Sequence, residues 1–152
     1  MMRLSKVLVV TSLVLSAIVT NAYAEEALKM ELQANKIVKN NQGKFTTTAA
    51  SNAKSGEVVQ YRATYTNTIN KPISDVAVTL PIPGNMTFNG VANPATAQAT
   101  TDGKNYADMP LMRKVDGKLV KVPLSEYKAL RWNIKWLPAN KSADVSLNTV
   151  VN

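Results

Sequence analysis

Apolar and polar residues alternate with a period of two in much of the chain beyond its N-terminal segment. The alternation is clearest in Gly56–Thr68, where every second residue is apolar: Val59, Tyr61, Ala63 and Tyr65. Successive side chains of a β-strand point to opposite faces of a sheet, so this pattern predicts a strand with one buried face. The polar row between them is then a solvated face in which Thr is favoured by its strand propensity. That row consists of Arg62, Thr64 and Thr66.

Similar short runs predict strands along the rest of the chain. The segments expected to form them are Leu28–Gln33, Ile73–Leu80, Met86–Val91, Ala95–Thr101, Asn105–Met109, Leu111–Val115, Lys118–Val122, Leu130–Trp136 and Val145–Val151. Asn35–Ser55 has little periodicity, and we expect a weak strand near Lys36–Lys39 followed by a loop. Pro123–Lys128 is expected to form a loop or a helical turn. Short strands with frequent turns in a chain of this size indicate an antiparallel sandwich or barrel.

Two Asp-Gly pairs indicate tight turns. Asp116-Gly117 stands between Leu111–Val115 and Lys118–Val122 and is the strongest hairpin signal, because Asp-Gly accepts the positive φ values needed between twisted strands. Asp102-Gly103 occurs in a segment with several oxygen donors, which ends at Asp108. Calcium prefers such ligands in larger number, and Lys104 opposes cation binding. We therefore interpret this segment as a turn and expect no metal site.

The first residues have the layout of a secretory signal peptide. Arg3 and Lys6 precede an apolar run over Val7–Val19, and Ala22-Tyr23-Ala24 provides the small residues of a cleavage site. A membrane-spanning helix needs roughly 20 apolar residues, and this run is shorter, so we expect cleavage after Ala24. Loss of the two basic residues lowers the net charge from +8 to +6. The mature chain is expected to be a periplasmic or secreted bacterial protein with no membrane span.

The composition excludes most kinds of catalysis. The chain has no His and no Cys, so it lacks the usual general base near neutral pH and the best thiol nucleophile. Ser-His and Cys-His arrangements are therefore impossible, and there is no Gly-rich phosphate loop. We expect no enzyme activity, no cofactor and no small-molecule substrate. Without disulfides, which export usually permits, the hydrophobic core must hold the fold.

Several motifs occur in an order that resembles one family. Lys54–Asn67 contains a Gly-acidic turn, an alternating Val/Tyr/Thr strand and Thr-Asn, and Asp75–Gly84 contains a Val-rich strand, Leu-Pro and Pro-Gly. Met86-Thr-Phe88 follows as a short strand, and Arg131–Val151 contains a Trp strand, a Leu-Pro turn and a final Val strand. Together they resemble the bacterial domain-of-unknown-function-11 repeats, over roughly Ala53–Val151.

This resemblance implies an immunoglobulin-like β-sandwich of an exported or cell-surface bacterial protein, with no established activity. The chain departs from the family pattern in carrying a single copy, where many relatives are repeat arrays. It also has Ala139-Asn140 in place of the usual Gly after Leu-Pro. The single copy argues against a role as a stalk or spacer.

The expected organisation has three parts. Residues 1–24 form the signal peptide, residues 25–52 form an N-terminal strand and polar loop packed on the sandwich, and residues 53–152 form the immunoglobulin-like domain of about seven strands. The core is expected to contain Val59, Tyr61, Ala63, Tyr65, Val76, Val78, Leu80, Phe88, Leu130, Trp132, Ile134, Val145, Leu147 and Val151.

Basic residues are concentrated in the last third of the chain. If Arg131, Lys135, Lys121 and Lys118 share an outward face, they form a patch that attracts an anionic glycan, lipopolysaccharide or nucleic acid. Such residues also keep a surface soluble, and lysines at a sheet edge discourage strand pairing. We favour this second interpretation and do not expect a nucleic-acid partner.

Trp132 and Trp136 are expected to share a face with Leu130 and Ile134. A row of aromatic side chains on one face can bind sugars, but large aromatics more often form the core of a sandwich. We favour a core position for Trp132. The position of Trp136, close to the end of the strand, remains open at this point.

The main functional hypothesis is a non-enzymatic structural or interaction module of the bacterial envelope. One alternative is an adhesive or binding module for an anionic envelope polymer or glycan, which would use the basic last third. A second alternative is an assembly subunit whose exposed edge strand receives or donates a strand, with Leu28–Lys39 as the segment concerned. The partner would be another envelope protein or an anionic polymer, and the sequence leaves the oligomeric state open.

Overall fold

The computed structural model describes residues 27–152, so the predicted signal peptide lies outside the described residues. The described part contains eleven strands and two short 3-10 helices: β1 (Leu28–Lys39), β2 (Phe45–Ala49), η1 (Ala50–Asn52), β3 (Val58–Asn67), β4 (Ile73–Pro81), β5 (Met86–Asn93), β6 (Gln98–Thr100), β7 (Ala107–Asp108), β8 (Met112–Val115), β9 (Lys118–Lys121), η2 (Leu124–Glu126), β10 (Ala129–Leu137) and β11 (Ser142–Val151). The prediction of an all-β chain is confirmed. The strands outnumber the roughly seven expected from the sandwich fold. No helix among the described residues is long and apolar enough to cross a membrane.

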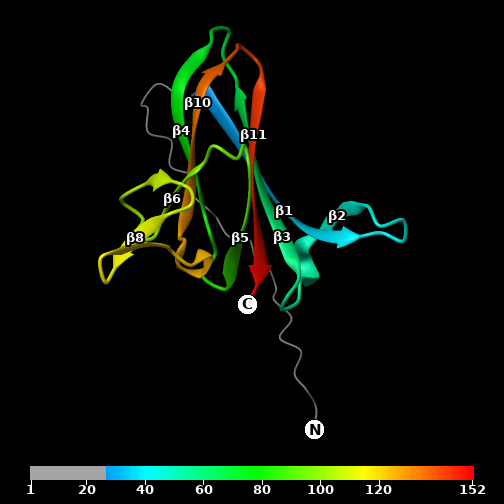
Figure 1. The fold of residues 1–152 in the computed structure, drawn as a ribbon. Helices are drawn as coiled ribbons and strands as arrows, with labels where there is room; N and C mark the ends of the chain where they lie inside the picture. The colour runs from blue at the N-terminus through cyan, green and yellow to red at the C-terminus, as the bar shows by residue number, and fades with distance from the viewer. Residues whose placement is uncertain (1–26) are drawn as a thin grey trace.

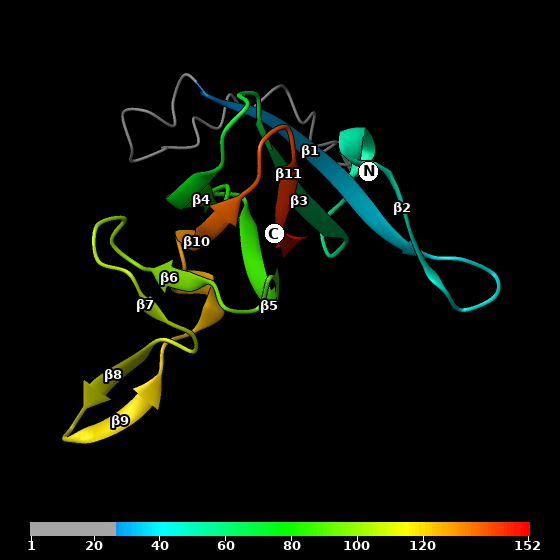
Figure 2. The same ribbon diagram turned by 90° about the horizontal axis from the view of Figure 1, so that it is seen from above.

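Two antiparallel sheets pack face to face (Figure 1). The larger sheet has the order β2-β1-β3-β11-β5, and the smaller one has the order β4-β10-β6-β7. Strands β8 and β9 pair only with each other and project away from the sandwich (Figure 2). The molecule therefore consists of a two-layer core with one separate hairpin attached to it.

The core lies between the two sheets and depends on β3, which pairs with β1 on one side and β11 on the other. The apolar row of β3 is buried and meets Val76, Val78 and Leu80 of β4 together with Leu130 and Trp132 of β10. Full burial of a large apolar side chain contributes roughly 1.5–3 kcal/mol. All predicted core residues are buried except Ile134, which is half-buried.

The N-terminal segment is part of the larger sheet. Strand β1 pairs with β3 from Leu28 opposite Asn67 to Ile37 opposite Val58, and its second half also pairs with β2. The prediction of a loop after Lys39 is therefore wrong, because β2 follows a tight turn. All five residues of β2 are exposed. A strand without a buried face has no apolar alternation, which is why its sequence, FTTTA, gave no signal.

The in-and-out alternation of β10 changes phase near its end. Trp132 is buried, whereas Lys135 and Trp136 are both exposed and Leu137 is buried again. The alternation of buried and exposed residues in the paired strand β4 is interrupted at the same place, where Asp75 has a φ of 52°. A residue in the left-handed region breaks the regular pleat of a strand. Trp136 is consequently 62% exposed and lies outside the core.

Asn67 is fully buried at the end of β3 and connects three segments. Its side-chain Nδ2 donates to the carbonyl oxygens of Lys71, at 2.8 Å, and of Leu137 and Pro138, at 3.1 Å each. Its Oδ1 accepts a hydrogen bond from the backbone N–H of Ile69 at 3.1 Å. A buried amide is tolerated when its donors and acceptor are satisfied in this way. Asn67 therefore joins the β3–β4 and β10–β11 connections to the central strand.

Replacement of Asn67 by Ala should lower the free energy of unfolding by about 2–4 kcal/mol, because the carbonyl groups that it serves lose their donor. Urea denaturation of the mature chain measures this loss. Asn133→Ala, at an exposed position of β10, is the control and should change the stability by no more than about 0.5 kcal/mol. Equal effects of the two substitutions would contradict the role assigned to Asn67.

Candidate functional site

Strands β8 and β9 form a hairpin in which basic and apolar residues are paired. Its tip is Asp116-Gly117, with φ values of 50° and 77°, as the Asp-Gly turn predicts. Each of its cross-strand pairs joins one basic to one apolar residue, and these pairs are Met112–Lys121, Arg113–Val120, Lys114–Leu119 and Val115–Lys118. Residues directly opposite each other share a face. Each face of the hairpin therefore carries two basic and two apolar side chains. We call residues 112–121 the cationic hairpin.

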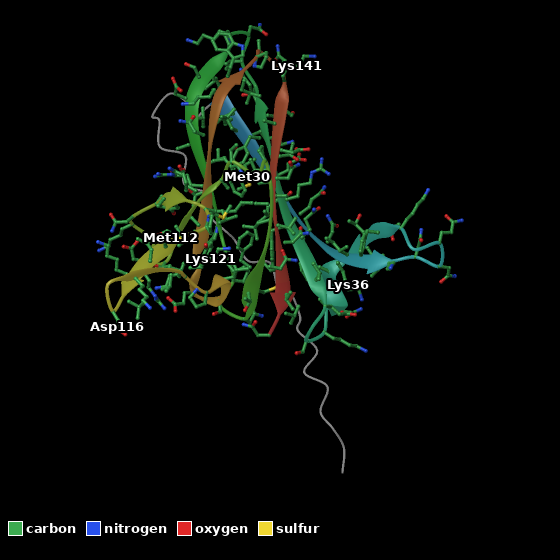
Figure 3. All side chains as sticks on the ribbon, in the orientation of Figure 1. Met30, Lys36, Met112, Asp116, Lys121 and Lys141 are labelled. Carbon is green, nitrogen blue, oxygen red and sulfur yellow. The ribbon has the colours of Figure 1, made fainter. Side chains whose placement is uncertain are left out.

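All strand residues of the cationic hairpin are exposed. The exposed fractions of its apolar residues are 61% for Leu119, 47% for Val115, 43% for Met112 and 37% for Val120. A two-stranded sheet is at best marginally stable alone in water, and here neither face packs on the sandwich. Figure 3 shows Met112, Asp116 and Lys121 on this element, away from Met30. Exposed apolar groups interspersed with cations make it a candidate contact surface.

The base of the cationic hairpin is firmly attached. Leu111 and Val122 flank the hairpin and are both buried, and the Val122 N–H donates to the Leu111 carbonyl at 2.9 Å. The Leu111 N–H donates to the Tyr127 hydroxyl at 2.8 Å. The Tyr127 ring in turn stacks on Phe88 of β5, with ring centroids 5.7 Å apart. The hairpin is thus exposed along its length but fixed to the core at its base.

Most basic side chains of the cationic hairpin form no ion pair with the described residues. It contains four basic residues and one acidic residue, Asp116. Arg113 forms a two-point ion pair with Glu126, with N–O distances of 2.7 and 3.1 Å. Among the described residues, no ion pair involves Lys114, Lys118 or Lys121. Three ammonium groups therefore remain available to an external anion.

Arg131 and Lys135, which the sequence analysis grouped with Lys118 and Lys121, lie elsewhere. Both line a shallow groove of about 330 Å³ on the outer face of the smaller sheet, together with Gln98, Asn133 and Asp108. Lys118 and Lys121 belong to β9 and do not line this groove. The four cations therefore do not form one patch.

The groove is a poor anion site because its cations already have partners. Arg131 donates to the Gln98 side-chain oxygen at 2.8 Å, and its guanidinium carbon lies 4.2 Å from the centre of the Tyr106 ring. The Lys135 ammonium lies 3.7 Å from a carboxylate oxygen of Asp75. Asp108 adds a further negative charge to the lining.

The Asp102 loop is stabilised by its own hydrogen bonds. The Asp102 carboxylate accepts the backbone N–H groups of Asn105 and Lys104, at 2.8 and 2.7 Å, and also the Asn105 side chain and the Thr100 hydroxyl. These hydrogen bonds hold the pKa of Asp102 well below its usual range. Asp108 instead accepts a hydrogen bond from Gln98. The Asp102 carboxylate is therefore the hydrogen-bond acceptor that closes this turn, in agreement with the interpretation of Asp102-Gly103 as a turn. Within residues 27–152 no group of acidic side chains is arranged to hold a metal ion.

The polar row of β3 is engaged with the neighbouring strand β11. Arg62 forms an ion pair with Asp144, and the Thr64 hydroxyl donates to the other Asp144 oxygen at 2.6 Å. The Thr66 hydroxyl lies 2.7 Å from that of Ser142. Arg62 above all, followed by Thr64, holds the pKa of Asp144 below its ordinary value of 3.8. This row stabilises the pairing of two strands, and its groups are not free for recognition.

The patch predicted from the sequence included Lys118 and Lys121 of the cationic hairpin but omitted its other strand residues: Met112, Arg113, Lys114, Val115, Leu119 and Val120. The signal was present, because folding the segment about Asp116-Gly117 places a basic residue opposite an apolar one at each step. The sequence could not show that both faces of the hairpin stay uncovered.

No protein-family model, curated protein or solved structure matches the chain.

Stability should depend on pH through Asp144. Its folded pKa is below its unfolded value, so its contribution is present above pH 3.8 and is lost as the pH falls through the folded pKa. Urea denaturation at a series of acidic pH values should therefore show a shallower loss of stability for Asp144→Asn than for the wild type. Thr64→Val, which removes only one donor, should give an intermediate slope. Identical slopes for wild type and Asp144→Asn would refute this assignment.

Proposed function

We propose that the chain is an exported, non-enzymatic interaction module of the bacterial envelope that binds an anionic lipid surface through its cationic hairpin. The observation that carries the proposal is the pairing of a basic with an apolar residue at each step of an exposed hairpin. The attachment of Leu111 to Tyr127 presents this hairpin in a fixed position. The sandwich acts as its scaffold.

The mixture of side chains favours a lipid surface over a soluble polymer. A Lys or Arg near an anionic membrane contributes about 1 kcal/mol of attraction. Apolar side chains add about 25 cal/mol for each Å² that leaves water, and of these two partners the lipid layer is the one that offers them an apolar environment. Val115 and Leu119 are the apolar residues nearest the tip, on opposite faces of the hairpin, and they can enter the layer while Lys114 and Lys118 extend to the headgroups. Phospholipid and lipopolysaccharide share this combination of phosphate and acyl chains.

The other features of the chain are consistent with this role. The signal-peptide layout of residues 1–24 leads to export, and the net charge of +6 expected after cleavage favours negatively charged surfaces. The two packed antiparallel sheets are compatible with the immunoglobulin-like sandwich that we propose for this chain.

Cosedimentation of the mature chain with vesicles tests the proposal. We expect salt-sensitive binding to vesicles of phosphatidylcholine with phosphatidylglycerol, and no binding to phosphatidylcholine alone. The double variant Lys118→Gln/Lys121→Gln should bind at least about tenfold more weakly, since it loses two attractive charges. Leu119→Ser should also weaken binding, although the charge is unchanged. Vesicles that contain lipopolysaccharide instead of phosphatidylglycerol show which lipid is preferred.

The control is Lys44→Gln/Lys141→Gln, which makes the same change of net charge at exposed positions outside the hairpin. Equal losses in the two double variants would mean that overall charge, not the hairpin, causes binding. Binding to dextran sulfate that Leu119→Ser leaves intact, without binding to anionic vesicles, would replace the lipid surface with a soluble polymer.

A further inference from the structure

The two sheets of the sandwich have free edges, and one differs from the others. Protein edges usually carry a charge, a proline, a bulge or only a short strand, which prevents pairing with other chains. In the smaller sheet, β4 carries Asp75 with φ of 52° and ends at Pro81, and β7 has only two residues. In the larger sheet, β5 has a register shift against β11 and Gly90 with φ of 93°. Strand β2 pairs with β1 only from Asn35 to Lys39, and the remaining free edge of β1 carries the charged residues Lys29 and Glu31.

Strand β2 has none of these protective features. Its sequence from Phe45 to Ala49 contains no charge, proline or glycine, and its register with β1 is regular. Thr and Phe have high strand propensity. Phe45 is 75% exposed, which is unfavourable for a side chain of this size in water. The β1–β2 hairpin also extends beyond the sandwich, on the side away from the cationic hairpin (Figures 1 and 2), so another chain can approach this edge.

We propose that β2 is a self-association edge, at which a second copy of the chain pairs antiparallel about a two-fold axis at Thr47. This register places Phe45 opposite Ala49 of the second copy, which matches a large side chain with a small one. It also places Thr46 opposite Thr48 of the second copy, and Thr47 opposite itself. Cross-strand Thr pairs are favourable, and the register brings no like charges directly opposite each other.

The partner that this edge fits is therefore the same chain. Pairing joins two five-stranded sheets into one continuous sheet. The contact involves only five residues of each copy, so it belongs to the class of small interfaces that form weak, concentration-dependent dimers. Leu28–Lys39, which the sequence analysis considered as the exchanged strand, is instead paired with β3 and, in its second half, with β2. The inference does not depend on lipid binding.

Single-cysteine variants test the register, because the chain contains no Cys. In the proposed pairing the two Cα atoms at position 47 lie roughly 4.5–5.5 Å apart, within the range that a disulfide bridges. Mild oxidation of Thr47→Cys should therefore give covalent dimers. Thr46→Cys is the matched control on the same exposed strand, because its two copies are offset by about 7 Å along the strand and are too far apart. An equimolar mixture of Thr46→Cys and Thr48→Cys should cross-link.

We expect Thr47→Cys to cross-link at least about tenfold faster than Thr46→Cys, because disulfide formation requires close Cα atoms. Equal rates, or no dimer from Thr47→Cys, would overturn the proposal. Sedimentation velocity gives a second readout without any thiol. The wild-type chain and Thr47→Val should dimerise as the concentration rises, whereas Thr47→Lys, which places two like charges opposite each other, should remain monomeric. Dimers of Thr47→Lys as stable as those of the wild type would also contradict this interface.

Discussion

The hydrogen bonds of Asn67 are the interaction on which the rest of the structure depends. The side chain of this buried residue serves carbonyl groups in the β3–β4 and β10–β11 connections, and its backbone N–H donates to the Lys141 carbonyl at 2.8 Å. Both sheets are therefore tied together at the end of the central strand. Because an unpaired buried amide is costly, the chain must bring these connections to one place. With that end fixed, the apolar rows of β3, β4 and β10 meet in register.

This arrangement leaves little free chemistry on the sandwich itself. The polar row of β3 is paired with β11, the Asp102 carboxylate completes its own loop, and Arg131 is held by Gln98 and Tyr106. Within residues 27–152, the cationic hairpin and the β2 edge lie on opposite sides of the molecule, and both are exposed (Figure 2). Lipid binding and self-association can therefore occur together, and a dimer would present two hairpins.

Much of the fold could be predicted from the sequence, because most strands have one buried and one exposed face. Strand β3 and most of β4 alternate accordingly, whereas β11 has three consecutive buried residues, Val145, Ser146 and Leu147. The Asp116-Gly117 hairpin was recognised from its turn. Strand β2 was missed because both of its faces are exposed. The position of Trp136 depends on the left-handed Asp75 of the neighbouring strand, which no local pattern reveals. The predicted patch of Lys118, Lys121, Arg131 and Lys135 does not form, because the first two lie on β9 of the separate hairpin and the last two on β10 of the sandwich. A basic, apolar hairpin has the same sequence pattern whether or not a sheet covers it.

Entry of the apolar residues beside the tip of the cationic hairpin, Val115 and Leu119, into an anionic lipid layer can be measured directly. Since the chain has no Cys, Leu119→Cys can carry a single polarity-sensitive fluorophore near the tip, and Thr87→Cys, on β5, can carry the same label on the sandwich. Addition of vesicles containing phosphatidylglycerol should shift the emission of the label at position 119 to the blue, and a quencher attached to the lipid acyl chains should reduce it. The label at position 87 should show neither change. Unchanged emission at position 119 while the protein is bound to the vesicles, or equal shifts at both positions, would contradict the account.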